Sequence, residues 1–389
     1  MHYLDHNATS PLRPESLSAM THALGISGNP SSVHGNGRAA RAIVEEARER
    51  VAALVGARGE QVIFTSGATE SNNLALFGAA EGSLADDSKN ETRRITRLFV
   101  SAIEHNSILV TAERLAERFP WIRLARLPVN ANGVIDLEAL RVALREGKGR
   151  ALVAIMAANN ETGMVQPVAE ISKLAREAGA LLLVDAVPAA GKMALDFSLC
   201  DYMTLSAHKL GGPQGVGALI VYDGTPLAPQ LVGGGQQKGL RAGTENLSGI
   251  AGFGAAAHSL RDAEGECARL AHLTDHFEQA LKRAMPEAIV FGEGAKRLCS
   301  TTCFAVPGVT AETALIGLDL DGVMMSSGST CSSGKVAISH VLLAMGVDEA
   351  LAACALRASF GWSSTMEDVT AAVASLVKLR ERVRSKEAA

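Results

Sequence analysis

The sequence is poor in aromatic residues and carries no cysteine pattern that would bind zinc or build a disulfide framework. Aromatic side chains make up 4% of the 389 residues, so a core must consist mainly of Ala, Val, Leu and Ile. The six cysteines form no CxxC pair, and no histidine or second cysteine pair completes a zinc pattern. We therefore expect no metal site and a chain with reduced thiols, for which the cytoplasm is the usual compartment.

Features of membrane and nucleic-acid proteins are also missing. The N-terminus, MHYLDHNATS, has neither the basic nor the apolar region of a signal peptide. No apolar run approaches the roughly 20 residues that span a bilayer. The formal net charge is -4 with both signs interspersed, whereas neutralising phosphates requires a basic surface. We expect neither a membrane nor a nucleic acid as a partner.

Short apolar runs alternate with helical patterns over the first two thirds of the chain, and the four runs from residue 151 on are of the kind found in buried parallel strands. The apolar runs are residues 61–65, 97–101, 151–157, 180–186, 202–206 and 217–222, and the helical patterns are 38–55, 70–80 and 167–178. The alternation predicts an α/β fold with a largely parallel sheet, whose ligands bind beyond the carboxyl ends of the strands. The polar residues 82–93 predict a surface loop.

The pattern changes after about residue 257 and indicates a second, smaller unit. Its features are a helix over 258–284, a Gly/Ser-rich loop over 326–334 and a helical tail over 366–385. The first residues are expected to fold back onto it. We divide the chain into a large domain of residues 15–256 and a small α+β domain of residues 1–14 with 257–389.

Lys209 is the first candidate for chemistry. It lies in SAHKL, directly after the apolar run 202–206 and before the glycine-rich GGPQGVG. Most lysines are solvated surface charges, but this position places the amine at the ligand end of the sheet. A partly desolvated lysine with a lowered pKa can form a Schiff base. Ser206 and His208 beside it could hold a phosphate.

Two other strand ends carry candidate ligands. Asp185 closes the run ALLLVDA and could cap the next turn or pair with a pyridinium nitrogen. TSGATESNN follows a strand and opens a helix, so Gly67, Ala68 and Thr69 could present backbone N–H groups and a hydroxyl to an anion. An ordinary capping box with Glu70 explains the same residues equally well.

Five further residues are candidates in weaker contexts. His105 could stack on a cofactor ring or move a proton, although a single histidine is more often structural. Asn160 could bond a cofactor hydroxyl or simply occupy a turn. Arg357 and Arg241 are possible anion clamps. Cys331 lies among serines and glycines in SSGSTCSSG, which favours an exposed, reactive thiol over a buried one.

Taken in order, these segments resemble a cysteine desulfurase of the fold-type I pyridoxal-phosphate (PLP) superfamily. More narrowly, they resemble the group that serves iron–sulfur cluster assembly and nitrogenase maturation. The matching segments cover nearly the whole chain and are YLDHNAT, GNPSSVHGNG, TSGATESNN, EHN, NNETG, VDA, SAHK, GGGQQKGLRAGTEN, SSGSTCSSG and LRASFG. The resemblance implies PLP as cofactor, L-cysteine as substrate, a homodimer, and an iron–sulfur scaffold or other sulfur-acceptor protein.

The resemblance also implies a role for each candidate residue. Lys209 would hold the cofactor and move the Cα proton, Asp185 would pair with the pyridinium, and His105 would stack on the ring. The phosphate ligands would be Ala68, Thr69, Ser206 and His208, with Thr244 of the partner subunit. Asn160 and Arg357 would hold the substrate at its carboxylate side. Cys331 would accept the sulfur as a persulfide while alanine leaves.

One position departs from the family pattern. Pro188, in DAVPAAG, stands where the family commonly has a glutamine that bonds the cofactor's phenolic oxygen. Proline has no donor, so either Asn160 bonds that oxygen alone or the cofactor is tuned differently.

Three other functions are compatible with parts of the pattern. A selenocysteine lyase or aminotransferase would share the PLP residues, although an aminotransferase needs no loop thiol. A nucleotide-binding oxidoreductase would use a similar sheet, but no GxGxxG follows the first strand. A non-catalytic sulfur-transfer scaffold would not be expected to retain both Lys209 and Cys331.

Overall fold

The computed structural model describes residues 1–87, 93–261, 263–327 and 337–387. A seven-stranded sheet with the order β2-β8-β7-β6-β5-β3-β4 forms its centre. The strands are β2 (Val62–Thr65), β3 (Ile95–Ser101), β4 (Arg123–Leu127), β5 (Arg150–Met156), β6 (Leu181–Asp185), β7 (Tyr202–Ser206) and β8 (Gly217–Val221). Strands β4, β3, β5, β6 and β7 run parallel to one another, which confirms the predicted α/β class with a largely parallel sheet.

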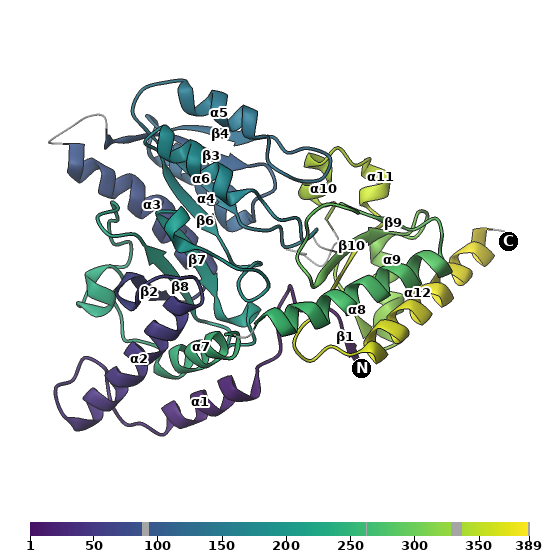
Figure 1. The fold of residues 1–389 in the computed structure, drawn as a ribbon, viewed down its shortest axis with the longest axis horizontal. Coiled ribbons are helices and arrows are strands. Elements are labelled where there is room, and N and C mark those ends of the chain that lie inside the picture. Colours follow the sequence, from purple (N-terminus) through teal and green to yellow (C-terminus); the bar gives the residue numbers. More distant parts are fainter. Residues whose placement is uncertain (88–92, 262, 328–336, 388–389) are drawn as a thin grey trace.

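Helices cover both faces of this sheet, and the strands are apolar on both sides for that reason. They are α2 (Gly35–Ala53), α3 (Ala68–Asp87), α4 (Asn106–Arg118), α5 (Leu137–Arg145), α6 (Val168–Glu177) and α7 (Leu247–Ser259). Within β5, Leu152 and Ala154 pack in the layer of α3 and α4. Val153 and Ile155 face α2, α5, α6 and α7 on the other side. This alternation is the two-residue period of a strand (Figure 1).

The structure corrects three of the predicted elements. The run 217–222 forms β8, which is antiparallel to both of its neighbours, β7 and β2. Residues 82–87 continue helix α3, so the predicted loop begins too early. The long helix expected over 258–284 is two helices, since α7 ends at Ser259 and α8 begins at Ala263.

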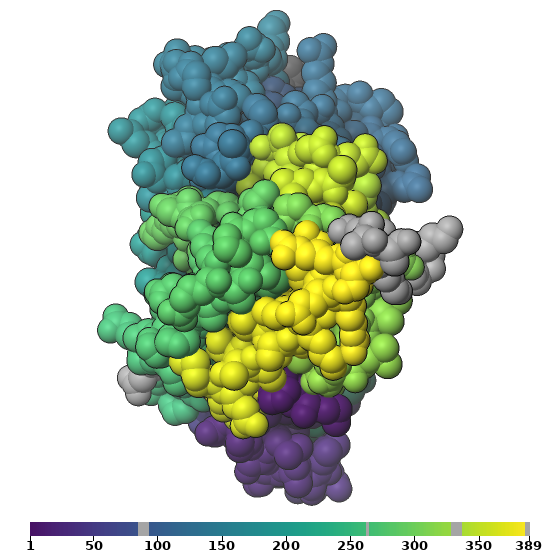
Figure 2. Space-filling model, turned by 90° about the vertical axis from the view of Figure 1, so that its right-hand side faces the viewer, coloured from purple at the N-terminus to yellow at the C-terminus, as the bar shows by residue number. Residues whose placement is uncertain are grey.

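A second group of elements packs around its own core. Its strands are β9 (Ile289–Val290), β10 (Thr301–Ala305) and β12 (Ala355–Ser359), with the separate pair β1 (His2–Tyr3) and β11 (Val323–Met324). Its helices are α8 (Ala263–Ala284), α9 (Ala311–Leu320), α10 (His340–Ala344), α11 (Glu349–Ala352) and α12 (Met366–Glu387). Helix α12 lies beside α8 on the outer face (Figure 2). None of the described helices is both long and apolar enough to cross a membrane.

This second core is built from aromatic and aliphatic side chains of distant segments. The ring of Phe277 meets those of Phe304 and Phe360 edge-on, with centroids 5.4 and 5.9 Å apart. Leu4 belongs to the same buried cluster, so the first residues do fold back onto these elements. The exact division into residues 15–256 and 1–14 with 257–389 stays a prediction.

The remaining helices are short or lie near the chain's start. Helix α1 (Pro14–Leu24) packs on α7. In the described part of the chain, single turns of 3-10 helix occur at Gly59–Gln61, Phe197–Leu199 and Ala207–Lys209, and an irregular turn lies at Gln236–Gly239.

Gly217, the first residue of β8, allows the turn before α3 to lie directly on the sheet. A Cβ atom at Gly217 would lie 2.7 Å from the Gly67 backbone and 2.8 Å from the Leu205 carbonyl oxygen.

We predict that Gly217→Ala destabilises the protein, because the new methyl group must push apart backbone atoms on two sides. Overpacking of this kind typically costs about 1–3 kcal/mol of unfolding free energy. The control is Gly235→Ala, since Gly235 has a φ of -81° and open space around its Cβ direction. Urea unfolding of both full-length variants measures the effect. Equal midpoints for the two variants would contradict the close approach.

Candidate functional site

A cavity of about 710 Å³ lies beyond the carboxyl ends of β5, β6 and β7. Its size is within the range of small-molecule sites. The predicted site residues that line it are Ala68, Thr69, His105, Asn160, Asp185, Ser206, His208, Lys209 and Arg357. They come from separate segments that the parallel sheet brings to one edge.

The Lys209 amine lies inside this cavity. Strand β7 ends at Ser206, and the following 3-10 turn, Ala207–Lys209, carries the lysine out over the sheet edge. Its Nζ donates to the backbone oxygens of Asn7 and, at 2.7 Å, of Ala8. Burial is the main cause that lowers the pKa of Lys209 to about 7, and the nearby cations Arg357 and Lys192 add to it. Much of the amine is therefore neutral and nucleophilic near pH 7.

Asp185 is connected to His105 by a chain of hydrogen bonds. One Asp185 oxygen accepts from Asn72 Nδ2 at 3.0 Å, and the other accepts from the Val187 N–H at 3.0 Å. Asn72 also donates to Ser107 Oγ at 2.8 Å, which lies 2.8 Å from His105 Nδ1. The carboxylate of Asp185 is thus held at the floor of the cavity.

The same chain of bonds determines the tautomer of His105. The Ser107 N–H donates to His105 Nδ1 at 3.1 Å, so this nitrogen carries no proton. In the neutral ring the proton is then on Nε2. Desolvation lowers the pKa of His105 below 6.5, an effect that the charge of Asp185 partly opposes. His105 therefore presents a neutral ring with a fixed orientation.

One end of the cavity is suited to an anion. Helix α3 begins at Ala68, and the first N–H groups of a helix have no partner within it. They lie beside Ser206 and His208. Burial is the main cause that lowers the pKa of His208 to about 4, so its ring is neutral at pH 7. Arg241, which the sequence predicted as an anion clamp, donates from its Nε to Glu70 at 2.8 Å. It therefore already has a partner within the protein.

At the other end lie Arg357 and Asn160. The guanidinium of Arg357 donates from Nη1 to the Asn160 backbone oxygen at 3.0 Å and from Nη2 to Asp5 at 2.7 Å. Asn7 Nδ2 donates to that same Asn160 oxygen at 3.0 Å. A guanidinium in a cavity is a strong receptor for a carboxylate. In this structure, Asp5 already accepts a hydrogen bond from one terminal nitrogen of the Arg357 guanidinium.

Four residues of the cavity and its walls were not anticipated individually, namely Asp5, Asn7, Asn72 and Lys192. Asp5 and Asn7 belong to YLDHNAT and Asn72 to TSGATESNN, so the motifs contained the signal. Lys192 has no such signal, since it lies in a turn seven residues after Asp185 and looks like any surface lysine.

The other positions singled out in the sequence are Cys331, Thr244 and Pro188. Cys331 lies outside the described residues, although Ser326 and Ser327 before it line the cavity. On the other side, Ser339 Oγ donates to Glu161 at 2.5 Å. Thr244 is exposed and does not belong to the residues that line this cavity, so its predicted place in the partner subunit's pocket stays a prediction. Pro188 lines the cavity, as its place after Asp185 requires.

This set of groups fits pyridoxal phosphate chemically. An aldehyde needs a neutral amine, which Lys209 offers, and a pyridinium nitrogen needs a buried carboxylate such as Asp185. A phosphate needs N–H and hydroxyl donors, which are present at the start of α3 and at Ser206. The flat ring of His105 lies in the same cavity.

The chain is similar to known proteins over almost its whole length. The family model described as aminotransferase class-V matches residues 2–372. The cysteine desulfurase IscS of Dictyoglomus turgidum is 38% identical over 98% of this chain and 95% of its own length. A NifS-like protein from Rickettsia africae superposes with a TM-score of 0.86 at 32% identity, covering 98% of this chain and 99% of that one.

A further solved structure, described as SspA in complex with cysteine, has a TM-score of 0.78 at 29% identity over 94% of this chain and all of its own. These matches extend over almost the whole chain, including both cores and every segment that lines the cavity. The protein therefore belongs to the class-V aminotransferase family and, within it, to the cysteine desulfurases.

Proposed function

We propose that this protein is a PLP-dependent cysteine desulfurase that converts L-cysteine into L-alanine and transfers the sulfur to Cys331. The observation that carries the proposal is the cavity itself, in which a half-neutral lysine, a buried carboxylate, a neutral histidine and a helix start face one space. Family membership supports the same reaction, and the similarity to SspA, whose structure contains cysteine, supports the substrate.

The cofactor would be held at three points. Lys209 would bind its aldehyde, Asp185 would pair with the ring nitrogen, and the start of α3 with Ser206 and His208 would hold the phosphate. When bound, PLP supplies a protonated ring that delocalises the electron pair left when the substrate's Cα proton is removed. The neutral ring of His105 would lie against it.

The protein's own residues would then perform the remaining tasks. Arg357 would exchange part of its contact with Asp5 for the substrate carboxylate, with Asn160 beside it. The Lys209 amine, with a pKa of about 7, can both accept and return a proton near neutral pH, which suits the Cα position.

Cys331 would complete the reaction through its thiolate. Attack on the substrate sulfur forms a sulfur–sulfur bond and breaks the carbon–sulfur bond. The carbon takes up a proton, so L-cysteine and the Cys331 thiol become L-alanine and a Cys331 persulfide. The persulfide sulfur would pass to an acceptor protein, such as a scaffold for iron–sulfur clusters.

We also propose a homodimer in which Thr244 completes the phosphate site of the partner subunit. Thr244 is exposed on its own subunit, as a residue that reaches across an interface must be.

We propose a cytoplasmic location as well. The five described cysteines are all free thiols, which supports a reducing environment.

Our prediction for Lys209 is that PLP added to the apo form of the full chain is captured there with a midpoint near pH 7. Only the neutral amine attacks the aldehyde, and a lowered pKa means that the neutral form predominates above about pH 7 instead of above 10.5. Borohydride trapping across a pH series, followed by peptide mapping, measures site and midpoint together. A label on another lysine, or a midpoint near 10, would refute the assignment.

For Cys331 we predict that Cys331→Ala abolishes sulfide release while binding of L-cysteine to the coloured holoenzyme persists. The reason is that Lys209 and Asp185 act on the carbon atoms, whereas Cys331 only receives sulfur. Cys200→Ala is the control, since this buried thiol lies in the core, away from the cavity. The release of sulfide and of alanine from L-cysteine is assayed for both variants. Desulfuration of cysteine at the parent rate would instead favour a selenocysteine lyase.

For the dimer we predict that Thr244→Ala keeps the dimer but binds PLP more weakly. Loss of one hydrogen bond to the charged phosphate should raise the Kd roughly ten- to hundredfold. Thr370→Ala, an exposed threonine on α12, is the control. Sedimentation gives the oligomeric state and fluorescence titration the Kd. A fully active monomer, or an unchanged Kd, would remove the role of Thr244.

A further inference from the structure

Lys192 is a second lysine in the cavity, and the functions described above do not use it. It follows β6 in the turn that continues past Asp185, and its side chain is half-buried. Its Nζ donates to Asn7 Oδ1 at 2.8 Å. The two lysine amines of the cavity therefore contact the same residue, since Lys209 donates to the backbone oxygen of Asn7.

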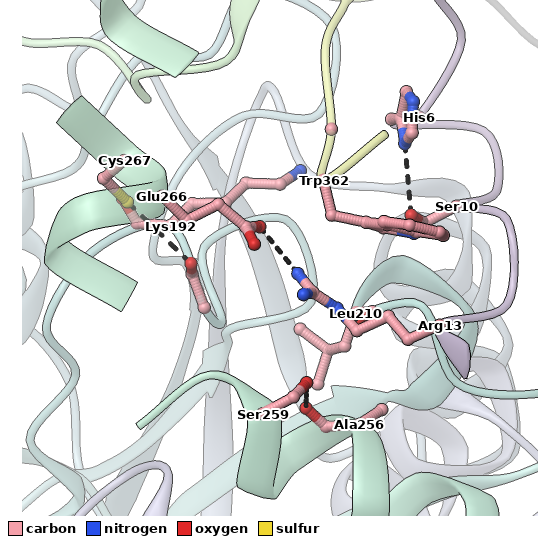
Figure 3. Close-up of polar contacts among 12 residues, drawn as sticks. His6, Ser10, Arg13, Lys192, Leu210, Ala256, Ser259, Glu266, Cys267 and Trp362 are labelled. Atoms are coloured by element: carbon pink, nitrogen blue, oxygen red, sulfur yellow. Dashed lines mark hydrogen bonds and ion pairs between the residues drawn. The ribbon is translucent and has the colours of Figure 1, made fainter. Parts of the chain in front are cut away.

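No carboxylate in the described part of the chain forms an ion pair with this ammonium. Glu266, an acidic residue whose charge acts on Lys192, is engaged by Arg13, whose Nη2 lies 2.6 Å from it. Figure 3 shows the Glu266 carboxylate turned toward the Arg13 guanidinium. Asp5 is likewise engaged by Arg357. A cation withdrawn from water without an opposite charge is costly, so an anion is expected from outside the chain.

The backbone of Lys192 is held in place from the other side. The thiols of Cys267 and Cys299 both donate to its carbonyl oxygen, at 3.2 and 3.7 Å. Cys267 comes from α8 and Cys299 from the segment before β10. The root of the side chain is thus fixed against the second core, while its amine lies toward the cavity.

Hydrogen bonds connect the Lys192 amine to the substrate end of the cavity. Asn7 accepts from Lys192 at its Oδ1 and donates from its Nδ2 to the Asn160 backbone oxygen. Arg357 donates to that same oxygen. Two cations, Lys192 and Arg357, therefore flank the pair of asparagines at one end of the cavity, opposite the helix start that suits a phosphate.

We propose that Lys192 is a substrate-binding residue that, together with Arg357, pairs with the α-carboxylate of the amino-acid substrate. The inference rests on the proposed function, because it assigns the missing anion to the amino acid bound there. Arg357 alone is half-committed to Asp5, and Lys192 supplies the charge that Asp5 cancels. Lys192 thereby selects amino acids that carry a free carboxylate over amines that do not.

The protonation state of Lys192 agrees with this role. Burial is the main cause that lowers its pKa to about 8, and the charge of Arg357 lowers it further, whereas Cys299 and Cys267 oppose the shift. At pH 7 the amine is still mostly protonated and can pair with a carboxylate. An incoming anion would favour the charged form further.

The test compares two ligands that differ only in the carboxylate charge, L-cysteine and L-cysteine methyl ester. Both are titrated into PLP-loaded Cys331→Ala protein, in which sulfur transfer is blocked, and the Kd is read from the cofactor absorbance. The variants are Lys192→Met, which keeps the length, and Lys192→Gln, which can still donate to Asn7. The control is Lys173→Met, which removes the charge of an exposed lysine on α6.

Both Lys192 variants should raise the Kd of L-cysteine roughly ten- to hundredfold and that of the ester less than about threefold, as expected for one charged contact. Lys173→Met should change neither. The inference is overturned if both ligands weaken in parallel, since Lys192 would then act through the fold or the cofactor, or if neither weakens. Failure of the proposed function would give a different result. The Cys331→Ala protein with Lys192 unchanged would then either lack cofactor absorbance or still release sulfide.

Discussion

The site depends on the way Asn7 ties the start of the chain to the sheet edge. Its backbone N–H donates to Ser359 Oγ at 2.9 Å, and its Nδ2 donates to Thr301 Oγ1 at 3.0 Å. Through these contacts it belongs to the second core. Its oxygens meanwhile accept from Lys209 and Lys192, which belong to the large sheet. Without Asn7 the two lysine amines would lack the residue that accepts from both, and the two halves of the cavity would lose one of their connections, beside that of Arg357 to the Asn160 oxygen.

Three cationic side chains, Lys209, Lys192 and Arg357, line the cavity and set its electrostatic character. Burial is the main cause that lowers the pKa values of Lys209 and Lys192, the charge of Arg357 lowers both further, and that of Lys192 also lowers the pKa of Lys209. A lysine that must react as a neutral amine benefits from such neighbours. The same positive charge attracts anionic ligands, so one arrangement serves both the nucleophile and the recognition of a carboxylate and a phosphate.

Another wall of the cavity is organised by a chain of hydrogen bonds. Asn72 connects the Asp185 carboxylate to Ser107, and Ser107 orients the ring of His105. Each of these side chains forms at least one hydrogen bond, which restricts its rotation. Under the proposed function, this restricted wall would favour chemistry that depends on alignment between a ring, a carboxylate and a lysine.

Much of this could be predicted from the sequence, because its signals are local. Apolar runs that end in Asp185 or Ser206 identify buried parallel strands, and parallel strands bring their carboxyl ends to one edge, so nine candidate residues fall in one cavity. The order of the motifs identifies the family for the same reason. The parallel direction expected for β8 was wrong, because an apolar run has the same sequence pattern in a parallel and in an antiparallel strand.

The contacts between distant segments were decided only by the tertiary structure. Asn72 and Asp185 are 113 positions apart, and Asn7 and Lys192 are 185 apart. No local periodicity encodes such pairs, because they depend on how the turns after the strands are shaped and on how the second core docks. The sequence by itself determined the α/β class, the family and the candidate lysine, Lys209, because these depend on local patterns and on the order of motifs. Only folding made Lys192 a cation without a counter-ion among the described residues, because burial and neighbours, which no local pattern records, set its charge balance.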